Sequence, residues 1–299
     1  MPLRRAHGIS LVLGVGMLGA LVGCRGTSDS STWEAVLEAR RLTSDARVQF
    51  NKAADAANRS VMADTDAASV SFAREARETT TRVEADAARL HPILQSLGYA
   101  EESRALETFD AAFKSYLELD AKVLALAVEN TNLKAQGLSF GPLRESADRL
   151  RDALQKLTER VAGAGSRRCQ AEALQARALL AVREIQVLQA PHIAEPDDAA
   201  MARLESRMTA LDATAHEATT GLARLVAPSG GGELGTAAIA ELDRFKALSA
   251  ELVALSRRNT NVRSLSMSLR EKPPLARACD DALGTLQDFL AKRGLNATR

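Results

Sequence analysis

Two asparagines, Asn130 and Asn259, are the residues of this sequence best suited to recognising a ligand. Each begins an Asn-Thr-Asn triplet and falls within a run of apolar residues. The runs are Tyr116, Leu119, Val123, Leu126 and Leu133, and then Phe245, Leu248, Leu252, Leu255 and Val262. Steps of three and four residues put such side chains on one stripe of a helix that faces other helices. A side-chain amide buried there without a partner costs about 1–3 kcal/mol, so each needs a protein group, a water or a ligand.

Two interpretations of these buried amides remain open. Asn130 and Asn259 can help to line a small polar pocket between helices, where helical bundles bind ligands. They can instead fix the register and the partner choice of their helices at some cost in stability. The third residues of the triplets, Asn132 and Asn261, are expected at the flank of the packing.

No other set of residues predicts chemistry. The sequence has four histidines, and neither a Cys-x-x-Cys-His haem motif nor a Glu-x-x-His pair occurs. The acidic run from Glu195 to Asp198 is best explained as a solvated helix start, whose negative charge suits the helix dipole. His192 extends an apolar stripe and is interpreted as a core or cap residue. We therefore expect no catalytic residue, no metal and no cofactor, and a protein that is not an enzyme.

The helices that carry the triplets belong to an internal repeat. The stretch from Leu126 to Ser139 recurs as Leu255 to Ser268 at a constant offset of 129 residues. The same offset carries Asp152-Ala153-Leu154 onto a second Asp-Ala-Leu at position 281. A repeat of this length has the size of a domain, which indicates one helical module that has been duplicated.

Composition predicts an all-α fold. Aromatic residues make up only 3% of the chain, and its abundant Ala, Leu, Arg and Glu favour helix over strand. We expect two tandem up-down-up-down four-helix bundles, at 33–165 and 166–294, joined near Gly163. Breaks are expected at 137–142 and at Pro273-Pro274, so that each fourth helix folds back into its own bundle. A net charge of +1 gives no reason to expect a nucleic-acid partner.

The N-terminus indicates export. Arg4 and Arg5 precede the apolar stretch 9–22, which is too short to span a membrane comfortably and is typical of a signal peptide, here 1–23. Cys24 after Leu-Val-Gly resembles a bacterial lipobox, which implies acylation of Cys24; an ordinary signal peptide with an incidental cysteine is the alternative. Residues 24–32 would then be a lipidated tether. Arg25 in place of aspartate favours the outer membrane, with the protein facing the periplasm of the bacterial envelope.

Parts of both halves resemble a known family. The stretch 124–142, with Glu-Asn-Thr-Asn-Leu-Lys-Ala and Leu-Ser-Phe-Gly-Pro, is similar to the third helix of the periplasmic domains of methyl-accepting chemotaxis proteins. The stretch 185–195, Ile-Gln-Val-Leu-Gln-Ala-Pro-His-Ile-Ala-Glu, is similar to the same four-helix sensor modules. The resemblance implies small-molecule sensing in two copies. No apolar span follows Lys292, and neither a HAMP segment nor a signalling domain is expected.

The leading hypothesis is a lipid-anchored, exported, sensor-like protein. It would bind a small ligand or dock onto a receptor or another envelope protein, and its membrane partner would be reached through the lipid anchor. The alternative is a structural or adaptor lipoprotein of the envelope that has no ligand.

Overall fold

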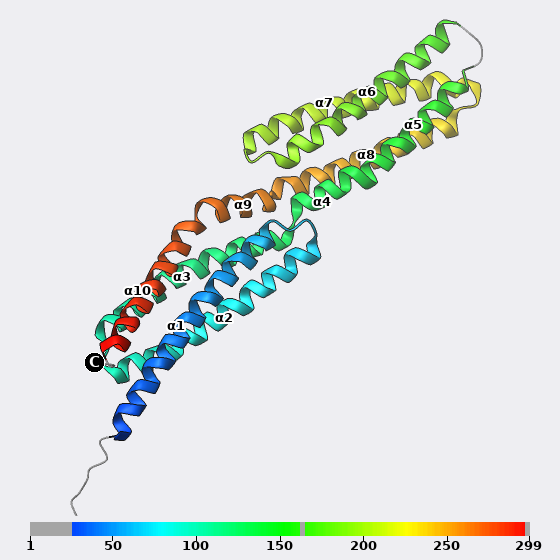
Figure 1. The fold of residues 1–299 in the computed structure, drawn as a ribbon. Helices are drawn as coiled ribbons and strands as arrows, with labels where there is room; N and C mark the ends of the chain where they lie inside the picture. The colour runs from blue at the N-terminus through cyan, green and yellow to red at the C-terminus, as the bar shows by residue number, and fades with distance from the viewer. Residues whose placement is uncertain (1–25, 162–164, 297–299) are drawn as a thin grey trace, which may run out of the picture.

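A computed structural model describes residues 26–161 and 165–296, and within these ranges the chain is helical apart from short connections (Figure 1). The elements in order are α1 (Gly26–Val61), α2 (Asp66–Leu97), α3 (Ala100–Glu129), α4 (Thr131–Leu138), the π-helical turn η1 (Ser139–Leu143), α5 (Arg144–Glu159), α6 (Ser166–Ala194), α7 (Asp198–Val226), the 3₁₀ turn η2 (Ala227–Ser229), α8 (Gly232–Arg258), α9 (Thr260–Arg270) and α10 (Lys272–Asn296). The all-α prediction is confirmed.

The N-terminal predictions fall partly outside these residues. The signal peptide at 1–23 and the lipidation site Cys24 lie outside the described ranges. Residues 26–32, predicted as a tether, form the first turns of α1 instead. Ser, Thr and Asp are only about 0.5 kcal/mol worse than Ala in a helix, so a stable helix can extend through them. None of the described helices is both long and apolar enough to cross a lipid bilayer.

Each repeat consists of a helical hairpin followed by a long, interrupted helix. The hairpins are α1–α2 and α6–α7, and the long paths are α3–α4–η1–α5 and α8–α9–α10. Figure 1 shows an elongated molecule in which both long paths run from one end to the other. The side chain of Thr65 caps α2, and that of Asp197 caps α7 at the equivalent end of the second hairpin.

The helices pack around two main cores, one towards each end. The first core joins α1, α2, α3 and α10, which we call the α1 group, and includes Phe50, Leu90, Phe109 and Leu283. The second joins α5, α6, α7 and α8, which we call the α6 group, and includes Leu154, Ile185, Leu222 and Phe245.

The predicted tandem arrangement is therefore not confirmed. The ranges 33–165 and 166–294 mark the two repeats, but each repeat contributes its last helix to the core of the other. The expected break at 137–142 is absent because η1 continues the helix with one wider turn around Pro142, which accommodates the missing N–H. Pro273 and Pro274 lie in the first turn of α10, where proline needs no hydrogen-bond partner. Since neither long helix folds back, the apolar face of its last helix, α5 or α10, is buried by the other repeat.

The two cysteines within the described ranges are free thiols, as predicted. Cys169 is exposed on α6, whereas Cys279 is buried in the α1 group. Burial raises the pKa of the Cys279 thiol to about 12. Cys279 therefore stays protonated and acts as a small apolar side chain.

Both ends of the described chain lie at the same end of the molecule (Figure 1). The guanidinium of Arg40, on α1, donates hydrogen bonds to the backbone oxygens of Leu290 and Ala291, near the end of α10. The α6 group occupies the opposite end.

Candidate functional site

The two long helices are both interrupted at the first asparagine of the triplets. Asn130 and Asn259 are buried and have left-handed backbone angles, with φ of 49° and 52°. Asparagine enters this region more readily than most residues that carry a side chain. The sequence suggested that both residues continue the apolar stripe of a helix, but they end α3 and α8 instead. We call the region where these two breaks meet the waist.

Each break leaves backbone N–H groups at the start of the next helix, and the other repeat accepts their hydrogen bonds. The N–H of Thr131 donates to Thr260 Oγ1 at 3.1 Å, and that of Thr260 donates to Thr131 Oγ1 at 3.2 Å. The N–H groups of Asn132 and Asn261 donate to each other's Oδ1, both at 3.1 Å. Helix starts need such acceptors. The repeats thus cap one another across a pseudo-two-fold axis, and Asn132 and Asn261 lie at its centre rather than at the flank.

The amide groups of the waist are satisfied on one side only. Asn132 Nδ2 donates to Ile193 O at 2.6 Å and to Asn259 Oδ1 at 2.8 Å, and Asn259 Nδ2 donates to Glu195 O at 2.8 Å. On the other side, Asn261 Nδ2 donates to Asn130 Oδ1 at 2.9 Å. Asn130 Nδ2 is buried and has no hydrogen-bond partner among the described residues.

This asymmetry follows from where the first helix of each hairpin ends. Helix α6 continues to Ala194, whereas α1 ends at Val61, which is equivalent to Ala190 at the 129-residue offset. The last turn of α6 and the residue after it bring the carbonyls of residues 193 and 195 to the waist. Because α1 ends about one turn earlier in its repeat, the equivalent amides lack these acceptors.

A pocket of about 370 Å³ opens at the waist. Equivalent residues of both repeats line it, namely Asn132 with Asn261, Leu133 with Val262, and Gln136 with Leu265, together with Val61, Met62, Ser139, Phe140, Ala190, Ile193 and Ala194. The walls are mainly apolar, with amide groups between them. Such a volume suits a small ligand, because known sites span about 300–1,000 Å³.

The sequence located this region and left open whether Asn130 and Asn259 line a pocket or are buried polar residues between helices; both are buried. Asn130 and Asn259 do not line the waist pocket; they hydrogen-bond to Asn261 and Asn132, which do. The duplication of the whole triplet was the available signal, since it includes the third residue as well as the first.

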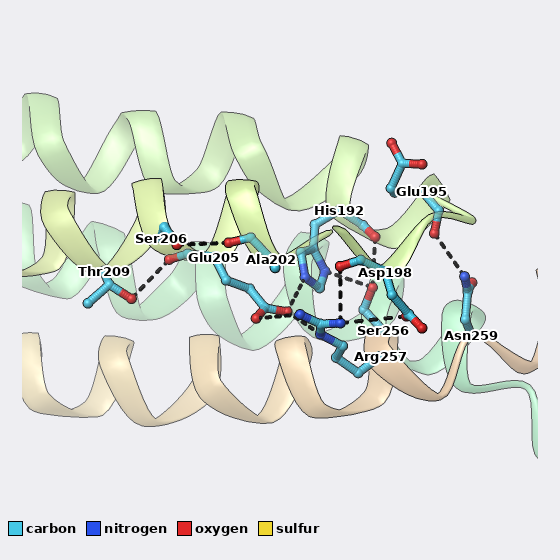
Figure 2. Close-up of polar contacts among 10 residues, drawn as sticks. All are labelled: His192, Glu195, Asp198, Ala202, Glu205, Ser206, Thr209, Ser256, Arg257 and Asn259. Carbon is cyan, nitrogen blue, oxygen red and sulfur yellow. Dashed lines mark hydrogen bonds and ion pairs between the residues drawn. The ribbon is translucent and has the colours of Figure 1, made fainter. Parts of the chain in front are cut away.

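His192 forms a second polar cluster, which Figure 2 shows between α6, α7 and α8. Its Nδ1 lies 2.8 Å from Ser256 Oγ, and its Nε2 lies 2.9 Å from Glu205 Oε1. Serine, histidine and carboxylate are connected in this order in hydrolases. Here, however, Ser256 and His192 are both 0% exposed, and Ser256 Oγ donates to the His192 carbonyl. A substrate could not reach this serine, so the cluster joins helices.

The acidic run beside His192 is explained by helix capping. Asp197 Oδ1 accepts a hydrogen bond from Ala200 N at the start of α7, and Glu195 Oε1 accepts one from Asp197 N. Within residues 26–161 and 165–296, no group of three or more His, Cys, Asp and Glu side chains could hold a metal ion.

Glu205 makes this cluster sensitive to pH. The Arg257 guanidinium holds the pKa of the Glu205 carboxyl below its usual value, His192 acts in the same direction, and partial burial opposes both. Because the folded pKa lies below the unfolded one, ionised Glu205 contributes stability above the unfolded pKa of about 4.3. That contribution is lost as the pH falls through the folded value.

We therefore expect Glu205→Gln to lower the free energy of unfolding by about 1–2 kcal/mol at pH 7. The difference from wild type should shrink as the pH falls below about 4. Urea unfolding at several pH values measures it. The control is Glu217→Gln on the same helix, since the side chain of Glu217 is 70% exposed and its pair with Arg177 should contribute little. A difference that grows towards low pH would contradict this account of Glu205.

A buried ion pair occupies the core of the α1 group, and the sequence analysis missed it. Lys272 Nζ lies 2.5 Å from Asp120 Oδ1, and their side chains are only 4% and 5% exposed. The ammonium also lies 5.1 Å from the centre of the Tyr116 ring. Burial raises the pKa of the Asp120 carboxyl, and Lys272 acts against this. Asp120 is buried in α3, next to Leu119 of the predicted apolar stripe, which is partly buried and packs against Val123 and its neighbours.

Comparison with known proteins assigns no family to this arrangement. The chain matches no protein-family model, no curated protein and no solved structure.

Proposed function

We propose that this chain is a lipid-anchored, exported binding protein of the bacterial envelope that holds a small apolar ligand in the waist pocket. Its helices form two four-helix bundles, which exchange their last helices and have the sensor-like character that the sequence suggested. The waist pocket carries the proposal, because it combines apolar walls with amide groups from both repeats.

The hydrogen bonds of the waist define the ligand further. Asn261 Nδ2 donates to Asn130 Oδ1, which leaves its second N–H for a ligand because an amide nitrogen has two donors. Both donors of Asn132 Nδ2 are already used. A neutral apolar molecule that carries one hydrogen-bond acceptor fits these groups best.

The ends of the chain support a lipid anchor. Residue 26 begins α1 at the end of the molecule where α10 ends. An acylated Cys24 would therefore hold the α1 group next to the membrane, with the waist pocket above it and the α6 group beyond. Acyl chains contribute about 0.8 kcal/mol per buried CH₂ to such anchoring.

A fluorescence titration tests the pocket. Prodan, an apolar fluorophore with a single ketone acceptor, should bind wild-type protein with a blue shift at a ratio of one to one. Ala190→Trp should abolish the shift, because exposed Ala190 lines the pocket and indole would fill it. Ala176→Trp, at an exposed position on the same helix but away from the pocket, should bind as wild type does. Equal binding by both variants would rule out the waist pocket as the site.

A second candidate function uses the same surface. Met62 and Phe140 at the rim of the pocket are 74% and 73% exposed, and exposed apolar side chains that lie together often mark protein interfaces. An adaptor protein of the envelope would cover them with a partner. In that case the wild-type protein captures an envelope partner but does not bind prodan, and the double variant Met62→Asp with Phe140→Asp no longer captures the partner.

A further inference from the structure

The two repeats carry different side chains at three equivalent positions. At the 129-residue offset, Tyr116 is equivalent to Phe245, Asp120 to Ser249, and Lys272 to Leu143. The offset holds in three dimensions, because the capping hydrogen bonds at the waist join residues 129 apart. The comparison therefore relates spatially equivalent places in the α1 group and the α6 group.

In the α1 group the chain supplies its own ammonium group. Lys272 lies 2.5 Å from the carboxylate of Asp120 and over the ring of Tyr116. Carboxylates and aromatic faces are both attractive to alkylammonium ions. This place in the α1 group thus has the contacts of an ammonium site, occupied by a residue of α10.

In the α6 group the equivalent place adjoins a groove of about 330 Å³ between α7 and α8. Phe245 and Ser249 line it, and the residue equivalent to Lys272 is the apolar Leu143. Ser249 Oγ is buried and has no hydrogen-bond partner among the described residues. The apolar side chains of Ile185, Met208 and Val253 complete the walls.

The carboxylates of Glu205 and Asp212 and the ammonium of Lys246 are the charged groups that line the groove. Asp212 lines the groove and pairs with Lys246 Nζ at 2.8 Å. The side chain of Lys246 is 63% exposed, whereas that of Asp212 is only 20% exposed. Because the Lys246 side chain is mainly solvated, a ligand ammonium can replace it beside Asp212 at small cost. Glu205, at the other end of the groove, is already paired with Arg257 and His192.

We propose that the α7–α8 groove binds a small primary alkylammonium ion. The ammonium lies near the Phe245 ring, donates hydrogen bonds to Ser249 Oγ and to the Asp212 carboxylate, and takes the role that Lys272 has in the other repeat. Its alkyl chain packs against Met208, Val253 and Ile185. This site is separate from the waist pocket, so the proposal does not depend on the function proposed above.

Isothermal titration calorimetry of the protein with n-pentylammonium at pH 7, against 1-pentanol, tests the recognition of the charge. The amine should bind one to one. The alcohol lacks the positive charge, so its affinity should be at least about tenfold lower. Asp212→Asn should lower the affinity for the amine by a similar factor. Equal affinity of the amine and the alcohol, or no binding of the amine at all, would overturn the proposal.

Two further sets of variants test the place of binding. Ala250→Trp, at an exposed position in the groove, should abolish amine binding, whereas Ala247→Trp, exposed on the same helix outside the groove, should leave it unchanged. The double variant Leu143→Lys with Ser249→Asp recreates the internal ammonium of the α1 group and should also exclude the amine. If this double variant does not fold, the tryptophan pair decides. Undiminished binding by Ala250→Trp overturns the proposal, and Ala190→Trp at the waist should have no effect on the amine.

Discussion

Replacing Lys272 by leucine, the residue at the equivalent position 143, is expected to lower the free energy of unfolding by about 3–5 kcal/mol. The substitution leaves the carboxylate of Asp120 buried without its cation, since both side chains are at most 5% exposed. It also removes the ammonium near the Tyr116 ring. Urea unfolding of the variant at pH 7, followed by circular dichroism, measures the loss.

Two comparisons separate the ion pair from simple packing. Asp120→Leu combined with Lys272→Leu should recover most of the stability, because an apolar pair of similar size is often as stable as a buried ion pair. The deficit of the single Lys272→Leu variant should also shrink as the pH is lowered from 8 towards 5. Burial raises the folded pKa of Asp120 above its unfolded value of about 3.9, so the folded state gains the proton first. A deficit that the double variant does not reduce would contradict this assignment.

The exchange of helices that brings this ion pair together could not be read from the sequence. Apolar spacing predicts that 143–161 and the chain after Pro274 are amphipathic helices, but a helix that folds back and one that continues have the same stripe. The choice depends on η1 around Pro142 and on the position of Pro273 and Pro274 in the first turn of α10. Once α10 continues into the α1 group, Lys272 meets Asp120, a contact between residues far apart in the sequence.

The candidate site was predictable to a similar extent. The repeat and its asparagines identified a polar region within the helices, and both Asn130 and Asn259 are buried. Their left-handed backbone was not predictable, because the apolar steps of three and four continue through both positions. The hydrogen bonds between the repeats depend on how two breaks meet in space. The missing acceptors on one side depend on α6 ending about one turn beyond the position equivalent to the end of α1, which the sequence interpretation did not foresee.

The unequal hydrogen bonding of the waist leads to the second large effect, a difference between two equivalent substitutions. The side chain of Asn132 makes three hydrogen bonds, to Ile193 O, to Asn259 Oδ1 and from Asn261 N. The side chain of Asn261 makes two, to Asn130 Oδ1 and from Asn132 N. At about 1 kcal/mol for each bond lost, Asn132→Ala should cost about 3 kcal/mol and Asn261→Ala about 2 kcal/mol.

Urea unfolding of the two variants and of the combined variant gives this difference directly. The combined variant should depart from the sum, because the two asparagines belong to one hydrogen-bond network across the axis and residues in contact are not additive. Asn261→Ala should also lower the affinity for prodan, since it removes the free N–H of the waist pocket. Ala176→Trp should change neither the free energy of unfolding nor the affinity for prodan. Equal costs for the two substitutions would mean that the carbonyls of α6 do not hold Asn132. The waist would then be a symmetric joint, and Asn261 would offer a ligand nothing that Asn132 does not.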